Sequence, residues 1–236
     1  MTDVIHHARY DGPEKTFAER AYRLIREDIV GGVLEPGLKL KIQMLQERYD
    51  IGAGPLREAL ARLSSDQLVE LEGQRGCRVA LMSAKDAREI GDLRKVLEAQ
   101  ALQQSIPAGD DAWETAVITA YHRLEQIERR LNQGISDLPE WEMRNQQFHK
   151  ALVAACDSRR LHWMRQLMFD QHERYRRLSR VKTVRTRDIN EEHRALFEAA
   201  VDRDVDKAVA VIGVHVQRTT DAVLAALAQQ DPVIKP

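Results

Sequence analysis

The chain has 236 residues, of which 43% are hydrophobic, 31% charged and 5% aromatic, a composition that excludes a disordered or low-complexity chain and permits one large or two ordinary domains. Lysine and arginine total 36 against 37 acidic residues, which excludes a uniformly basic nucleic-acid-binding protein but not a local basic face. No apolar run approaches the roughly 20 residues that cross a bilayer, and no signal peptide is expected. Cys77 and Cys156 match no metal or redox spacing. We expect both to be reduced, in a cytoplasmic protein.

The first predicted element is a helix that begins after Thr16. Thr16 and Glu19 are spaced as in a capping box, in which the threonine hydroxyl accepts a backbone N–H bond. Apolar residues then recur at helical spacing until Gly31 and Gly32, which end the helix. A second short helix is expected over residues 42–49.

A third helix and a β-hairpin are predicted next. The Gly52-Ala53-Gly54 segment breaks the chain, and Pro55 suits the first position of a helix that ends near Ser65. Apolar and polar residues then alternate on both sides of a turn at 73–76, which predicts two antiparallel strands. The residues expected to face inwards are Val69, Leu71, Cys77, Val79 and Leu81.

Three short helices followed by a hairpin are typical of a winged helix-turn-helix, whose third helix enters the major groove of DNA. Any small α+β domain has the same order of elements, and residues 16–83 hold equal numbers of basic and acidic residues. The placement of the basic residues favours DNA binding, since they fall before the second helix, on the third helix and on the wing. These residues are Lys39, Lys41, Arg57, Arg75 and Arg78.

From residue 83 onward the pattern is almost wholly helical. Ser83 is a candidate N-cap, and Ile90, Leu93, Leu97 and Ala101 form the expected core stripe of the first helix. Further helices are expected to include Trp113 to Leu131, to follow Pro139 as far as Val153, and to lie around 159–180, 188–203 and 205–229. No repeat of 20–50 residues occurs, which favours a bundle over a solenoid. The predicted fold is mainly α, with a flexible arm at 1–15, a winged helix-turn-helix at 16–83, an all-helical domain at 84–230 and a tail at 231–236.

Polar side chains interrupt several apolar faces in the helical part. Asn145 and His149 project from one face of their helix, and His193 and His215 also lie on apolar faces. Each alone is more often a hydrogen-bonded core residue. Together, three imidazoles and an amide oxygen form a candidate metal site with an open position. Arg94 also lies among apolar residues, where an unpaired cation is costly, and Glu98 is its candidate partner. The histidines expected at the surface are His6, His7, His122, His162 and His172.

These residues resemble a known family. Leu34-Glu-Pro-Gly37, Pro55-Leu-Arg-Glu-Ala-Leu60 and the wing 75–79 resemble the winged-helix domain of GntR-family transcription regulators. The C-terminal part is similar to the helical ligand-binding domain of the FadR-type branch, often called FCD. The matching residues there are Leu93-Arg94 with Glu98, Asn145 to His149, Glu192-His193-Arg194, and Asp204 through Ala208 to His215.

The resemblance implies a homodimer that binds a short palindromic operator in double-stranded DNA and responds to a small organic acid. The DNA contacts it implies are Lys41, Gly54, Pro55, Arg57, Gln74 and Arg75. The C-terminal domain would bind the effector and form the dimer, with Arg94 and Glu98 at the effector. The implied ligands of a divalent metal, zinc as purified with nickel or manganese as alternatives, are Asn145, His149, His193 and His215.

Two departures from the family pattern alter these expectations. Gly52-Ala53-Gly54 stands where the family usually has Ser-Arg-Thr, so the operator is expected to differ from the usual consensus. This form is similar to the subgroup of carbon-starvation-induced regulators, which suggests glutarate or a related dicarboxylate. Asn145 stands where many members have aspartate. A neutral ligand leaves more positive charge on the metal, which favours an anionic effector and weakens metal binding.

The sequence therefore predicts a transcription regulator, a repressor of carbon-metabolism genes, rather than an enzyme. An activator is a further alternative that the sequence leaves open. One alternative is a regulator whose metal is structural or absent and whose effector is not an acid. A more remote alternative is a metal-dependent hydrolase, because three histidines with an open site can activate water. Glu98 is the sole candidate for its general base.

Overall fold

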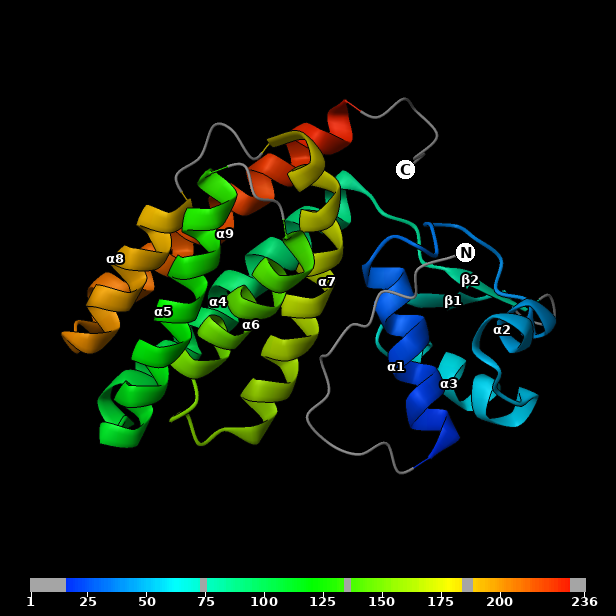
Figure 1. Cartoon of the computed structure of the whole chain (residues 1–236), viewed down its shortest axis with the longest axis horizontal. Helices are drawn as coiled ribbons and strands as arrows, with labels where there is room; N and C mark the ends of the chain where they lie inside the picture. The colour runs from blue at the N-terminus through cyan, green and yellow to red at the C-terminus, as the bar shows by residue number, and fades with distance from the viewer. Residues whose placement is uncertain (1–15, 73–75, 134–136, 184–188, 230–236) are drawn as a thin grey trace. The chain divides into compact units, whose positions relative to one another are not determined.

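A computed structural model describes residues 16–72, 76–133, 137–183 and 189–229, so the predicted arm at 1–15 and tail at 231–236 lie outside the described residues. The described residues form nine α-helices and one two-stranded sheet, which confirms the mainly α fold (Figure 1). They divide into two compact units. The first holds the described residues up to Ala87, Asp170–Lys182 and the end of the last helix from Val223. The second holds Arg88–Phe169 and Thr183–Ala222.

The first unit begins with the three short helices that the sequence predicts. They are α1 (Phe17–Val30), α2 (Ile42–Tyr49) and α3 (Ala53–Ser65). The backbone N–H of Glu19 donates to Thr16 Oγ1 at 3.1 Å, and Gly31 caps the other end of α1. Both α1 and α2 pack against α3. The core between them contains Ala21, Ile25, Leu45, Leu56, Ala59 and Leu63.

The start of α3 differs from the prediction by two residues. The helix begins at Ala53, with Gly52 as its N-cap, so Pro55 is its third residue rather than its first. The first backbone N–H groups of a helix have no partner within the helix, so a proline lacking its N–H is tolerated throughout the first turn.

The wing consists of β1 (Val69–Leu71) and β2 (Cys77–Val79), paired antiparallel with Val69 opposite Val79. Residues 37–40 pair with the other side of β2, because Leu40 N donates to Cys77 O at 2.9 Å. The predicted inward set was wrong for two residues: Leu71 is 62% exposed and Leu81 49%. Leu71 is next to the tip of the hairpin and Leu81 follows the end of β2, so both lie where the strands leave the core.

The C-terminal half of α7 (Arg159–Thr183) belongs to the same unit. Its Asp170 pairs with Arg26 of α1 at 2.5 Å. The hydroxyl of Tyr175 accepts from Ser83 N at 3.0 Å and donates to Asp86 Oδ2 at 2.6 Å. Ser83 caps α4 (Ala84–Ala108), since its hydroxyl accepts from Asp86 N at 3.1 Å. This half of α7 therefore holds both α1 and the start of α4.

His172, on the same half of α7, corrects a prediction. It was expected at the surface, but it is fully buried. Its neighbours Gln171, Glu173 and Arg174 are buried as well. Polar residues next to a histidine in the sequence therefore do not show that the histidine is exposed, because another part of the same unit can cover a charged helix face.

The second unit is a bundle of helices (Figure 1). It contains α4 from Arg88, α5 (Asp111–Asn132), α6 (Leu138–Leu152), α7 to Phe169, α8 (Ile189–Val201) and α9 (Val205–Ala228) as far as Ala222. Helix α5 packs against both α6 and α8. The core includes Trp113, Val117, Phe148, Leu196 and Ile212. Among the described helices, none has the length and apolar character needed to cross a membrane.

The buried face of α4 was predicted incorrectly. Leu93 is 54% exposed and Leu97 is half-buried, whereas Arg94 and Glu98 are both 1% exposed. The inward positions follow the spacing of Ile90, Arg94, Glu98 and Ala101, which is equally helical. The expected stripe is therefore wrong for Leu93 and Leu97, whereas Arg94, expected among apolar residues with Glu98 as its partner, is buried with that partner.

Two glycines in the bundle should respond oppositely to alanine. A Cβ on Gly91 of α4 would lie 2.3 Å from Thr220 Oγ1 and 3.2 Å from Thr220 Cβ, so rotating the threonine side chain does not relieve the clash. Gly91→Ala should therefore lower the free energy of unfolding by about 1–3 kcal/mol. Gly213→Ala, in α9, meets no atom within 4 Å and should raise it by about 0.5–1 kcal/mol. Denaturant titration measures both, and equal stability of the two variants would contradict the packing described.

Candidate functional site

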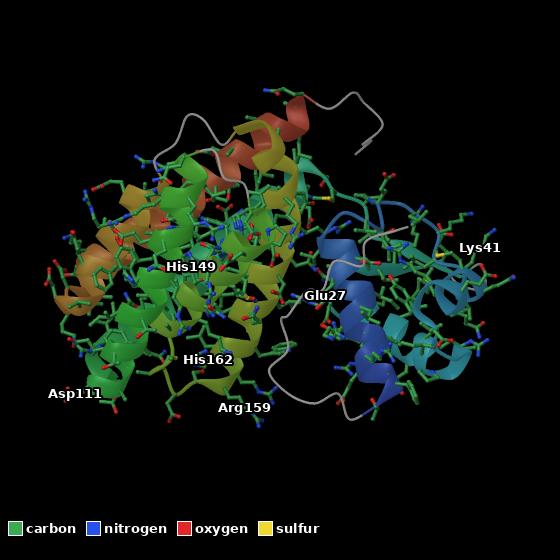
Figure 2. The ribbon with its side chains drawn as sticks, viewed as in Figure 1. Glu27, Lys41, Asp111, His149, Arg159 and His162 are labelled. Atoms are coloured by element: carbon green, nitrogen blue, oxygen red, sulfur yellow. The ribbon has the colours of Figure 1, made fainter. Side chains whose placement is uncertain are left out.

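Three histidines from three helices converge in the second unit. His149 of α6, His193 of α8 and His215 of α9 form a histidine triad whose donor nitrogens lie within 4.8 Å of one another. Their ring centroids are 5.0 to 5.6 Å apart. All three are buried, and Figure 2 labels His149 within the bundle. The structure therefore brings together three of the four residues proposed as metal ligands, and Asn145 lies one helical turn before His149 on α6.

Two carboxylates orient the rings of the triad. His193 Nδ1 lies 2.7 Å from Glu128 Oε1, and His215 Nδ1 lies 2.9 Å from Glu192 Oε2. A carboxylate accepts, so Nδ1 donates in both rings, which leaves Nε2 as the atom that could bind a metal ion. Histidines that bind metals are commonly held by a carboxylate on the other nitrogen in this way.

Several buried acceptors of this cluster have no hydrogen-bond partner among the described residues. They are Asn145 Oδ1, His149 Nε2 and His193 Nε2. Buried polar atoms are nearly always satisfied, because leaving them unpaired costs free energy. A divalent cation would satisfy all three at once. Imidazole nitrogen and amide oxygen suit zinc, nickel or manganese, so these residues fit a metal.

The pKa of His149 agrees with this chemistry. Burial lowers the pKa of His149 well below its ordinary value, and the positive charges of neighbours including Arg94 and Arg165 lower it further. The ring is therefore neutral around pH 7. A neutral imidazole offers the lone pair that a metal ion requires.

Buried arginines adjoin the triad. Arg94 Nε lies 3.4 Å from Glu98 Oε1, and Arg165 of α7 donates through Nη1 to both oxygens of Glu98, at 3.1 and 3.2 Å. Arg94 Cζ lies 4.5 Å from the centroid of the Phe169 ring, and the His149 ring lies 5.8 Å from the same centroid. Arg94 and the triad therefore share one aromatic neighbour. The proposed pair of Arg94 with Glu98 is present, and Glu98 is engaged by arginine rather than placed to act as a general base.

A second candidate site lies on the winged helix. A groove of about 500 Å³ runs between the start of α2, α3 and the wing. Lys39, Lys41 and Arg57 line it together with Leu60, Leu71 and Gly76. Within the described part of the chain, no ion pair or hydrogen bond engages the charged groups of these three cations. Figure 2 labels Lys41 on this unit.

Two other basic residues of the winged helix are already paired. Arg48 bonds Asp28 at 2.7 Å. Arg78, which the sequence placed among the DNA-facing residues, bonds Glu70 at 3.0 Å and Glu72 at 3.1 Å. Of the basic residues that the sequence placed towards DNA, Lys39, Lys41 and Arg57 therefore keep their charge unneutralised among the described residues.

The remaining predicted DNA contacts are only partly placed. Gly54 and Pro55 lie in the first turn of α3, but they do not line the groove. Gln74 and Arg75, at the tip of the wing, lie outside the described residues.

Sequence reasoning missed three residues of the bundle site. They are Glu128 of α5 and Arg165 and Phe169 of α7, which lie 16 or more positions from each residue proposed as a metal or effector ligand, and no local pattern marks them. Glu192 was singled out as part of a motif, but not as the partner of His215. Its position next to His193 was the one available signal.

Comparison with known families covers both units. The family model described as "Bacterial regulatory proteins, gntR family" matches residues 17–79, and the model of the FCD domain matches residues 89–218. An HTH-type transcriptional regulator, BphR of Paraburkholderia xenovorans, is 36% identical over 89% of this chain and 86% of its own length. The HTH-type transcriptional repressor GlaR of Escherichia coli is 37% identical over 82% of this chain and 90% of its own.

A solved structure shows the same fold. McbR/YncC of E. coli aligns with a TM-score of 0.77 over 91% of this chain and 99% of the other, at 18% sequence identity. At that identity the likeness concerns the arrangement of the helices and the wing alone.

Proposed function

Because the chain belongs to the GntR family of bacterial transcription regulators and carries an FCD domain, we propose that it is a repressor whose operator binding is controlled by a small carboxylate at a metal centre in the bundle. The chain is a regulator and not an enzyme. The observation that carries the proposal is the histidine triad with its unpartnered acceptors, next to the buried Arg94. Similarity to the repressor GlaR supports the sign of the regulation.

The DNA-binding half of the proposal rests on the groove. Lys41 at the start of α2 and Arg57 on α3 present unneutralised charge on one surface, with Lys39 between them and the wing. Phosphates are the groups that such cations bind, and α3 would enter the major groove. Gly54, Pro55, Gln74 and Arg75 are proposed as further contacts. Two-fold symmetry of a homodimer would require a palindromic operator.

The effector half rests on the neutral ligand set. Asn145 and imidazole are neutral ligands when they bind a metal, so a divalent ion held there would keep its positive charge and an open coordination position. An anionic oxygen is the natural group to fill that position. Arg94 would bind the same carboxylate. We propose zinc as the metal, with nickel or manganese as alternatives, and glutarate or a related dicarboxylate as the effector.

Coupling between effector and DNA follows from the course of three helices. Helices α4, α7 and α9 each have one part in either unit. In the second unit they carry Arg94, Arg165 and His215, and in the first unit α7 bonds Arg26 and Ser83. Closure of these helices on an effector would therefore displace the residues that hold α1 and the start of α4. We place the boundary between the DNA-binding domain 16–83 and the effector and dimerisation domain 84–230 at this junction, in a protein that acts in the cytoplasm.

The proposal is tested by selecting operators from a random pool of double-stranded DNA with the purified protein, then titrating the selected duplex. We expect a palindromic consensus bound by a dimer. Three unneutralised cations in each of two grooves give about six phosphate contacts, so affinity should fall roughly 10³-fold between 50 and 200 mM salt. Fluorescence anisotropy measures this slope.

The effector is tested in the same assay with small mono- and dicarboxylic acids, with and without a chelator. Release of the operator by an acid, abolished by the chelator, is the expected result. Selection without sequence enrichment would refute the DNA-binding assignment, and an operator that no acid releases would refute the effector. If an acid tightened the complex instead, the protein would be an activator or a co-repressor-dependent regulator.

A further inference from the structure

Arg165 is a buried cation to which the proposed function gives no contact with the effector. It is 2% exposed, and it lies on α7, 71 positions from Arg94 in the chain. Glu98 is shared between the two arginines: its Oε1 lies 3.4 Å from Arg94 Nε and 3.1 Å from Arg165 Nη1. Two buried guanidinium groups thus share the Glu98 carboxylate.

The hydrogen-bonding of Arg165 is incomplete. A guanidinium has five N–H donors in a fixed plane, and both hydrogen bonds from Arg165 to Glu98 are donated by Nη1. Its Nε is buried without a hydrogen-bond partner among the described residues. Leaving such a donor unpaired inside a protein is costly, and the cost is greater for a charged group. Arg165 therefore lacks a hydrogen-bond acceptor, whereas the triad has acceptors that lack a partner.

These two deficits are close together. Phe169 lies one helical turn after Arg165 on α7, and its ring contacts both Arg94 and His149. The positive charges of Arg94 and Arg165 also both act on His149. With a metal ion held by the triad, the buried cluster would have two places for anionic oxygen, one on that ion and one at Arg165. Arg94 contacts both the Phe169 ring and Glu98.

We propose that Arg165 is a specificity-determining residue that binds a second carboxylate of the effector, so that the effector site selects small dicarboxylates over monocarboxylates. This inference rests on the proposed function, in which the first carboxylate binds at the triad and Arg94. Glu98 positions both guanidinium groups for the task. A monocarboxylate fills the first place and leaves Nε of Arg165 unpaired, whereas a dicarboxylate satisfies both.

The experiment compares diacids with monoacids of equal chain length on the full-length, metal-loaded protein. Succinate, glutarate and adipate are paired with butyrate, pentanoate and hexanoate, and calorimetry measures each affinity. The wild type should bind at least one diacid about 10-fold or more tightly than its monoacid counterpart. Arg165→Gln should weaken that diacid by about 10- to 100-fold and the monoacid by less than about twofold, since only the diacid loses charge-assisted hydrogen bonds.

Matched variants separate this role from a structural one. Arg160→Gln removes an exposed arginine from the same helix and should leave both affinities unchanged. Arg165→Lys keeps a cation beside Glu98 but loses Nε, and it replaces the glutamine variant if that variant does not fold. Metal content and operator affinity in the absence of acid are measured for each variant and should equal those of the wild type.

The possible results distinguish the inference from the function beneath it. If the wild type binds diacids but Arg165→Gln weakens diacid and monoacid equally, or neither, Arg165 is structural and the inference is wrong while the proposed function stands. If the wild type holds metal and binds operator but takes up no acid, both the inference and the acid effector are wrong. A preference of the wild type for monoacids would likewise overturn the inference alone.

Discussion

Replacing His193 by alanine is expected to lower metal affinity at least about 100-fold and to abolish the response to acid. The substitution removes one of three clustered nitrogen ligands. Glu128, which orients that ring at 2.7 Å, keeps the hydrogen bond that Trp141 Nε1 donates to it at 3.2 Å. Loss of an orienting partner alone typically costs 10- to about 100-fold in affinity, and loss of a ligand costs at least as much. Elemental analysis after dialysis against known free zinc measures the effect.

His122→Ala is the matched control. His122 is an exposed histidine of α5 that bonds Gln126, so its loss should change neither metal content nor stability. Circular dichroism then separates the open alternatives. A His193→Ala protein that stays folded but ignores acid supports a sensing metal, whereas one that unfolds supports a structural metal. Undiminished metal content in a folded His193→Ala protein would refute the assignment of the triad.

Metal removal should also act on stability. A ligand that binds only the folded state contributes about 2.7 kcal/mol when present at 100 times its dissociation constant. Because the triad and Asn145 are buried with unsatisfied acceptors, the metal-free protein carries the desolvation cost of those atoms without compensation. On the proposed function, metal bound at the histidine cluster would therefore contribute to stability as well as to effector binding.

Residues of this site that share a helix could be placed together from the sequence, whereas contacts between residues of different helices could not. Asn145 and His149 share a helix, and helical periodicity was sufficient to place both on its buried face. His193 and His215 were proposed from the apolar residues next to them, and the structure brings them to His149. Periodicity contains no information about contacts between helices, so Glu128 and Arg165 had no signal.

The errors in the winged helix and in α4 have a common cause. Alternation and helical spacing identify a repeating face, but they do not say which of two similar faces is covered. Leu93 and Arg94 are neighbours on α4, and either fits a helical stripe. Arg94 is the buried one, because Glu98 pairs with its charge and the Phe169 ring packs against its guanidinium group. Leu71 was placed inwards by alternation, although the wing extends beyond the core at that point. Burial of charge is decided by partners far away in sequence.

Replacing Arg57 by alanine is expected to weaken operator binding by about 1–3 kcal/mol, or roughly 5- to 150-fold, if this side chain contacts a base edge. Arg57 lies on the exposed side of α3, in the groove shared with Lys39 and Lys41, where no acidic group neutralises it within the described part of the chain. Fluorescence anisotropy with the selected duplex and a scrambled duplex measures the effect. A loss confined to the selected duplex indicates base recognition, whereas an equal loss on both, with a salt slope reduced by about one per subunit, indicates a phosphate contact.

Arg62→Ala provides the internal comparison, because it removes the same charge from the same helix on another face. Arg62 Cζ lies 4.5 Å from the centroid of the Tyr22 ring of α1 and lines no part of the groove. Its loss should cost stability, about 0.5–1 kcal/mol for an exposed cation–π contact, and leave operator affinity nearly unchanged. If Arg57→Ala and Arg62→Ala lowered affinity equally, net charge rather than the groove would control binding. If Arg57→Ala had no effect, α3 would meet DNA through another face, and Lys41 with the wing would have to supply the contacts.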